Sequence, residues 1–347
     1  MKSNLKKYFP MIREREELLR EIQEDANLWK VYSQLGTEIK EEFLDFCTGM
    51  RGAKILRDSF FKEVINPEYN PGVLEDLLCV FLGRKVKIVR ILPNDSTRIS
   101  DETSLLITDI IVELEDGSLA NVEIQKIGYA FPGQRSACYS ADMLLRQYKR
   151  VRSQQGKQFD YKQIKTVYLI VIYEKSPKEF HKFPNTYFHH AQQSFDSGLE
   201  MDLLQEYVMI PLDMYHKRKD NKPIETKLDA WLTFLSDDSP EHIIELINRY
   251  PEFRPMYEML YQMCLNVEKV MNMFFSEELR ILDRNTVQYM IDEQQREIDT
   301  QKKEIDTQKK EIDMQKAALQ QKDELINRQT EELDTLRQEL EKLREKV

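Results

Sequence analysis

The sequence is poor in residues that interrupt helices and in patterns that mark common functional sites. Ten glycines and twelve prolines among 347 residues indicate an ordered chain rich in helix. Its four cysteines are far apart and form no CxxC pair, which excludes a zinc ribbon and is typical of reduced thiols in a cytosolic protein. The five histidines lack the spacing of metal ligands. Without a GxxxxGK[ST] motif, we expect no nucleotide cofactor and no ATP-driven step.

Long apolar runs are also missing. No window approaches the roughly 20 apolar residues of a membrane span, and the first residues carry no apolar core of a secretion signal. We therefore expect a cytoplasmic protein without a membrane partner. The net charge of -10 argues only weakly against nucleic acid as a partner, because charges of opposite sign can be segregated along a chain.

Four regions follow one another along the chain. Residues 1–50 repeat apolar positions at helical spacing and predict a helical N-terminal region, whereas residues 51–235 mix helix and strand patterns. Residues 236–290 predict a helical extension, and residues 291–347 carry a seven-residue repeat. A chain of this length suggests about two domains, or one domain with a long appendage.

The mixed region predicts a small sheet between helices. A helix ending near Leu82 precedes three strand patterns, "KVKIVRIL", "SLLITDIIVEL" and "LANVEIQKI", and the hairpin signal Asp116-Gly117 joins the last two. A helix follows from "QRSAC", and "KTVYLIVIY" has the continuous apolar run of a central strand. Weaker patterns add a strand in "EYVMIPLDMYHK" and a helix in "ETKLDAWLTFLS". This order is typical of an α/β fold with helices on the faces of a sheet.

Two carboxylates, Asp109 and Glu123, interrupt the apolar strands of the hairpin. Either they lie on a solvated face of the sheet, or they hold a cation, because an isolated charge is rarely left in apolar surroundings. Strand alternation places Glu123 and Gln125 on one face, and the hairpin brings Asp109 close to the same edge. With the backbone carbonyl of Ile124, these are the oxygen ligands that Mg²⁺ prefers. We favour a metal site that activates water and stabilises charge on a phosphodiester.

The block "SLLITDIIVELEDGSLANVEIQKIGYAFPGQRSACYSADMLLRQY" resembles the PD-(D/E)XK nuclease superfamily. It is more closely similar to the branch described as PD-(D/E)XK nuclease family transposase, which is related to recombination-promoting nucleases. The resemblance extends over about residues 50–235. It implies a restriction-endonuclease-like α/β fold, with a central mixed sheet flanked by helices, and a magnesium-dependent endodeoxyribonuclease in which manganese is a possible substitute. It also implies mobile-element or recombination biology.

The resemblance assigns the catalytic residues as Asp109, Glu123 and Gln125, with Asp109, Glu123 and the Ile124 carbonyl on the metal. The superfamily often adds an acid from the preceding helix, for which Glu75 is the candidate and Asp76 the reserve. The superfamily's usual third residue is lysine, but Glu-x-Gln is normal in this branch. Gln125 carries no charge and can only orient water or form hydrogen bonds. More of the electrostatic stabilisation would then come from the metal.

The helix after the hairpin predicts contact with DNA. Its polar and basic residues are Gln134, Arg135, Tyr139, Arg146, Lys149, Arg150 and Arg152. Lysine and arginine contacts to phosphates supply most sequence-independent affinity for DNA. The alternative is a solvated helix face with a tyrosine in the core, but the clustering of these residues directly behind the candidate site favours DNA.

The C-terminal repeat predicts a parallel coiled-coil homodimer through residues 291–347. Nine apolar residues are spaced by seven: Ile291, Ile298, Ile305, Ile312, Leu319, Ile326, Leu333, Leu340 and Val347. Glutamates such as Glu304 would meet lysines such as Lys309 of a parallel partner. Glutamine at the other core position, as at Gln308, keeps a solvated single helix open as an alternative. A dimer would let each subunit cut one strand of a duplex. The other hypothesis for the whole protein is a catalytically inactive nuclease fold that serves as a scaffold or binds DNA.

Overall fold

The computed structural model describes residues 4–68, 70–92, 110–125, 131–219, 223–275 and 284–344. The chain divides into two compact units, Met1–Arg284 and Asn285–Val347. The first unit contains a sheet and many helices. The described part of the second unit is the helix α13 (Arg284–Arg344), whose first residue belongs to the first unit.

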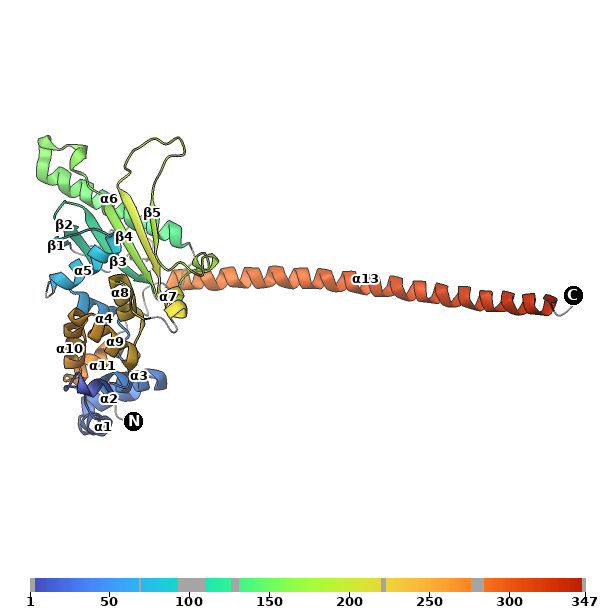
Figure 1. The fold of residues 1–347 in the computed structure, drawn as a ribbon, viewed down its shortest axis with the longest axis horizontal. Helices are drawn as coiled ribbons and strands as arrows, with labels where there is room; N and C mark the ends of the chain where they lie inside the picture. The colour runs from blue at the N-terminus through green and yellow to red at the C-terminus, as the bar shows by residue number, and fades with distance from the viewer. Residues whose placement is uncertain are drawn as a thin grey trace. The chain divides into compact units, whose positions relative to one another are not determined.

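A six-stranded sheet lies within the first unit (Figure 1). Its strands in sheet order are β1 (Ile88–Leu92), β2 (Ile110–Leu114), β3 (Leu119–Gln125), β4 (Val167–Tyr173), β6 (Gln205–Pro211) and β5 (His189–Gln192). Strands β1, β2 and β3 pair antiparallel, β3, β4 and β6 run parallel, and β5 pairs antiparallel with β6. This mixed sheet among helices confirms the predicted α/β architecture, and the carboxyl ends of β3, β4 and β6 share one edge.

The predicted hairpin joins β2 and β3. Its turn closes with a hydrogen bond from the Gly117 amide to the Leu114 carbonyl at 2.9 Å. Gly117 has φ +85°, a left-handed conformation that glycine adopts without a Cβ clash. Asp116 Oδ1 accepts the Ser118 amide at 3.0 Å, which fixes the turn further. The local sequence therefore sets the register of the two strands.

Eleven helices are described in the first unit, and one apolar core joins most of them to the sheet. They are α1 (Arg15–Glu24), α2 (Ala26–Gln34), α3 (Thr37–Cys47), α4 (Asp58–Ile65), α5 (Pro71–Leu82), α6 (Pro132–Gln155), α7 (Leu212–Lys219), α8 (Lys227–Ser236), α9 (Pro240–Arg249), α10 (Arg254–Met263) and α11 (Val267–Phe275). Residues such as Phe46, Leu77, Trp231 and Phe274 share this core with Val122 and Ile172 of the sheet. Helix α5 begins with Pro71 and ends before Gly83, as its sequence predicts.

Helix α6 covers the other face of the sheet. Tyr139 packs on Leu169 and Val171 of β4, and Met143 packs in a second cluster with residues of β2, β3 and β4. Gln147 holds the helix in place, since its Nε2 donates to the Gly117 carbonyl at 3.2 Å and its Oε1 accepts the Lys165 amide at 2.8 Å. Two apolar clusters therefore hold α6 on this face of the sheet. Polar residues on the same face form the candidate site.

Two elements differ from the pattern of the sequence. The strand predicted in "EYVMIPLDMYHK" ends at Pro211, and the chain continues as α7. Proline has no amide hydrogen to extend the ladder, so it is a natural end for a strand. Strand β5 was not predicted, because His189–Gln192 is short, polar and mostly exposed. It forms through pairing with β6 at the edge of the sheet.

The second unit is one continuous helix. The isoleucines of the seven-residue repeat lie about half exposed on it, with 45% exposure for Ile298 and 49% for both Ile305 and Ile312. Such a stripe is available to a partner, and pairing of two copies stays a prediction. Among the described residues, no helix is long and apolar enough to cross a membrane.

Candidate active site

Strand β3 places Glu123 and Gln125 side by side on the face beneath α6. Gln125 Nε2 donates to Glu123 Oε1 at 2.9 Å. Both side chains are buried, with 4% exposure for Glu123 and 2% for Gln125. The side chain of Ile124 packs on the main core at the opposite face, as strand alternation requires. The predicted pair is therefore brought together, and the carboxylate is held within the sheet rather than on a solvated face.

Asn121 extends this polar row by one more position on the same face. It is fully buried, and neither atom of its amide has a hydrogen-bond partner among the described residues. Buried amides normally form hydrogen bonds, because an unmet donor or acceptor costs about 1–3 kcal/mol. Asn121 is not among the site residues predicted from the sequence. The signal for it is a polar residue two positions before Glu123 in an apolar strand, because alternation puts both residues on the same face.

Tyr173 brings a hydroxyl to this row from the neighbouring strand. It lies opposite Gln125 in the parallel register of β3 and β4 and is fully buried. Burial raises the pKa of Tyr173, and the negative charge of nearby Glu123 raises it further. Its hydroxyl faces that of buried Ser136 in the first turns of α6, without a well-formed hydrogen bond. Five polar side chains from two strands and one helix thus converge.

Arg135 adds a positive charge at this edge. Its guanidinium lies near enough to Tyr173 to oppose the rise of that tyrosine's pKa. Arg135 Nη2 donates to the Tyr139 hydroxyl at 3.1 Å, one helical turn away. Tyr139 is itself only 4% exposed, so it supports Arg135 from the core. Gln134, the neighbour of Arg135, is exposed.

The remaining basic residues predicted to bind DNA fall into two groups. Arg146 Nε contacts Asp142 Oδ2 at 2.6 Å, and Arg150 Nη2 contacts Glu113 Oε1 of β2 at 3.1 Å, so these arginines take part in ion pairs. Lys149 and Arg152 are exposed. Their charges are therefore the more accessible ones for phosphates.

Three predicted metal ligands remain. Asp109 lies outside the described residues, and the metal-binding role of the Ile124 carbonyl stays a prediction. Glu75 Oε1 accepts the Ile88 amide at the start of β1 at 2.8 Å. Asp76, the reserve, accepts the indole N–H of Trp231 at 2.8 Å and contacts Lys227 at 3.2 Å. Both acids thus have structural partners, and the metal-binding role of Glu75 stays a prediction.

The donor atoms of the site fit a hard divalent cation. Glu123 supplies a buried carboxylate, and Gln125 Oε1 is buried without a hydrogen-bond partner among the described residues. Mg²⁺ takes such oxygen ligands and usually keeps several waters. The described ranges contain no group of three or more His, Cys, Asp or Glu side chains placed to hold a metal.

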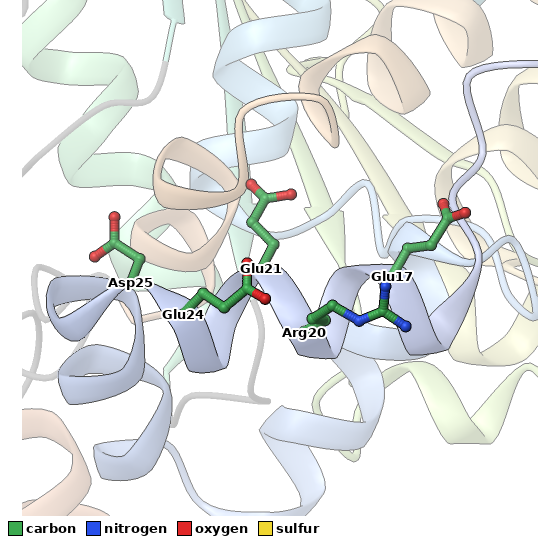
Figure 2. A pocket seen from close by; sticks show the side chains of 5 residues that line it. All are labelled: Glu17, Arg20, Glu21, Glu24 and Asp25. Carbon is green, nitrogen blue, oxygen red and sulfur yellow. The ribbon is translucent and has the colours of Figure 1, made fainter.

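A surface hollow of about 490 Å³ lies elsewhere, beside α1 (Figure 2). Its lining is mostly acidic and comes from α1 and from Asp25, which directly follows this helix: Glu17, Arg20, Glu21, Glu24 and Asp25. Glu21 is paired with Arg13 at 2.6 Å. Such a surface would repel phosphates, so we assign it no part in DNA contact.

Comparison with known proteins gives one result for the chain. A sequence model of the family described as PD-(D/E)XK nuclease family transposase matches residues 55–290. The matched range contains the whole sheet and α6, and with them Glu123, Gln125 and the basic residues. Neither the curated proteins nor the solved structures contain a significant match.

Proposed function

The chain belongs to the PD-(D/E)XK nuclease family transposases, and from this premise we propose that it is a metal-dependent DNA endonuclease that hydrolyses phosphodiester bonds. The observation that carries the proposal is the buried carboxylate of Glu123, hydrogen-bonded to Gln125 and close to Tyr173. A buried carboxylate beside an amide oxygen is the kind of oxygen ligand set that a hard divalent cation binds.

The residues proposed to hold the cation are Asp109, Glu123 and the carbonyl of Ile124, with Glu75 as a further candidate. We expect Mg²⁺, with Mn²⁺ as a possible substitute. When bound, such an ion lowers the pKa of a water ligand and stabilises charge on a phosphodiester. Asp109 enters this proposal from the sequence motif alone.

The other residues of the site would position the reactants. Gln125 donates through Nε2 to Glu123, which leaves its buried Oε1 as an acceptor for a water molecule. The Asn121 amide, deeper on the same face, offers a donor and an acceptor to further water. Arg135 would neutralise phosphate charge at the edge of the site, in the position where Tyr139 supports it.

DNA would approach along α6. Gln134 and Arg135 at its start, and exposed Lys149 and Arg152 further along, would contact the phosphate backbone. Arg146 and Arg150 would contribute mainly through their ion pairs with Asp142 and Glu113. Residues 291–347 would join two copies in a parallel coiled coil, so that each subunit can cut one strand. We further propose a role in recombination or in mobile elements, which the transposase description of the family supports.

The test is cleavage of supercoiled plasmid by the purified full-length protein in Mg²⁺, in Mn²⁺ and in EDTA. We expect metal-dependent nicking by the wild type and none by Asp109→Ala or Glu123→Ala. Glu115→Ala is the matched control, because Glu115 is an exposed acid in the turn of the same hairpin. Nicking that persists in Glu123→Ala would refute the assignment of the site.

The alternative is a catalytically inactive nuclease fold that binds DNA or acts as a scaffold. It is favoured by Gln125, which stands where the superfamily usually has a charged lysine. Wild type and both variants would then be equally inert in every metal, while binding of the plasmid persisted.

A further inference from the structure

Three aromatic rings form a cluster at the end of α6 and in the turns that follow it. Tyr148 and Tyr161 are stacked, with ring centroids 6.1 Å apart and planes within 17°. Phe159 meets both edge-on, with centroid distances of 5.5 Å to Tyr148 and 5.1 Å to Tyr161. We call Tyr148, Phe159 and Tyr161 the aromatic platform.

Tyr161 is open to solvent, whereas Tyr148 and Phe159 are partly buried. Tyr161 is 72% exposed, so most of the ring surface not resting on Tyr148 is free of protein. The exposed ring of Tyr161 leaves apolar surface in contact with water. Packing in the core therefore does not account for an aromatic residue at this position.

The backbone around Tyr161 is nevertheless fixed. Asp160 caps the short helix Tyr161–Gln163: its side chain accepts the Lys162 amide at 3.0 Å, and its own amide donates to Gln163 Oε1 at 3.2 Å. Further along, the Lys165 amide is bound to Gln147 of α6. The ring is therefore presented by an ordered turn, which reduces the entropy lost when a ligand binds.

The charge around the platform is strongly positive. Between Met143 and Tyr173 the chain has seven basic side chains and one acidic one, in a protein whose net charge is -10. Two of the seven, Arg146 and Arg150, are paired with Asp142 and Glu113, which leaves five. Arg152 lies over the Tyr148 ring, with its guanidinium carbon 5.6 Å from the centroid, and donates to the Tyr148 hydroxyl. Lys149, Lys157 and Lys162 are exposed in the same stretch.

An exposed aromatic ring within a basic surface matches the way proteins bind unpaired nucleotides. Bases stack on aromatic side chains, and lysine and arginine contact the phosphates between them. In a duplex the bases are already stacked on one another and offer no free face. A protein partner would be expected to meet a larger apolar surface and less concentrated charge.

We propose that the aromatic platform binds a single-stranded segment of DNA, with an unpaired base stacked on Tyr161. This inference deepens the proposed function and rests on it, because it specifies the substrate as DNA with an unpaired stretch beside the cleavage site. Arg135 and Tyr148 are thirteen positions apart on α6, or about 20 Å at 1.5 Å per residue. In Figure 1 the end of α6 and the turns after it lie beyond the ends of the neighbouring strands. A strand that contacts both would span this length and also pass around the helix, because thirteen residues correspond to about 220° of rotation beyond three full turns at 3.6 residues per turn.

The test is binding of labelled oligonucleotides of equal length to the full-length protein in EDTA, so that no cleavage interferes. The probes are a single strand, a fully paired duplex and a duplex with a central gap of unpaired nucleotides. Tyr161→Ala should weaken binding of the single strand and the gapped duplex about tenfold, the usual scale of one base–aromatic stack. Its effect on the paired duplex should stay below about twofold.

Two variants serve as controls. Tyr161→Phe keeps the ring and should bind like the wild type. Trp29→Ala removes an exposed aromatic residue from α2, where Trp29 is 46% exposed, and should leave all three affinities unchanged. Circular dichroism would verify that each variant is folded.

The inference is overturned if Tyr161→Ala leaves binding unchanged, or if it weakens binding of all three probes equally. Its failure differs from failure of the proposed nuclease. If plasmid cleavage is lost only in the site variants and Tyr161→Ala binds DNA like the wild type, the proposed platform is refuted and the proposed nuclease is retained. Selective loss of single-strand binding in a protein that never cuts keeps the platform and removes the nuclease.

Discussion

Replacing Glu123 with glutamine should make the metal-free protein more stable while abolishing cleavage. The substitution keeps the shape of the side chain and an oxygen to accept the hydrogen bond from Gln125, but it removes the charge. Glu123 is only 4% exposed, and burial disfavours the charged form of a carboxyl group. A catalytic acid placed to hold a cation is therefore expected to lower stability while the cation is absent.

The size of the effect follows from two opposing contributions. Burial of a carboxylate costs several kcal/mol even after the protein relaxes. A hydrogen bond to a charged group returns about 1.5–3 kcal/mol, of which a neutral acceptor keeps about half. We expect Glu123→Gln to raise the free energy of unfolding by about 1–2 kcal/mol, or the melting temperature by about 2–4 °C for a unit of this size.

Metal should reverse part of the difference. At a Mg²⁺ concentration ten times its Kd, binding to the folded wild type adds about 1.4 kcal/mol of stability. Glu123→Gln should gain much less, because it has lost a ligand. The assay is thermal unfolding of both proteins in EDTA and in Mg²⁺ at matched ionic strength, beside plasmid cleavage.

Glu113→Gln is the matched control, since it makes the same change on the adjacent strand. Glu113 contacts both Arg150 and Arg90, so loss of its charge should destabilise the protein in EDTA. If Glu123→Gln also proved less stable than the wild type in EDTA, the charge of Glu123 would be part of a stabilising ion pair. The proposal that Glu123 is buried in order to hold a cation would then be refuted.

Three further predictions concern the basic helix, the coil and the buried amide. Lys149→Ala should reduce the slope of log affinity for DNA against log salt by about 1, as for one lost phosphate contact. Arg150→Ala should mainly lower the free energy of unfolding, by about 1–2 kcal/mol. Equal salt slopes for the two variants would contradict this division. Ile305→Asp should convert the full-length dimer to monomer in sedimentation equilibrium, and Lys303→Asp on the outer face of the repeat should not; a wild-type monomer would exclude the coiled coil. Asn121→Val should raise the free energy of unfolding by about 1–2 kcal/mol and lower the cleavage rate; a loss of stability in urea denaturation would show that the amide is hydrogen-bonded in the folded chain.

Local pattern was enough to predict much of the central fold. The hairpin followed from Asp116-Gly117 between two apolar runs, and strand alternation placed Glu123 and Gln125 on one face. The helix that follows the hairpin was predicted from its helical pattern, beginning at "QRSAC", and the central strand around Ile170 from its continuous apolar run. These features depend on residues two to four positions apart, so the sequence carries them directly. The seven-residue spacing of Ile298 and Ile305 is of the same kind.

The tertiary structure decided which distant residues meet. Tyr173 lies 48 positions beyond Gln125 and becomes its neighbour only through the parallel pairing of β3 and β4. Glu113 forms an ion pair with Arg150 and not with Lys149, because only one face of α6 packs against the sheet. Tyr148 and Tyr161 stack because the chain turns back after Gly156. No short-range period encodes such pairings, since they arise when elements separated by dozens of residues bury their apolar faces together. The sequence therefore determined the secondary-structure elements and the acids they carry. Tertiary packing determined which side chains from distant elements become neighbours.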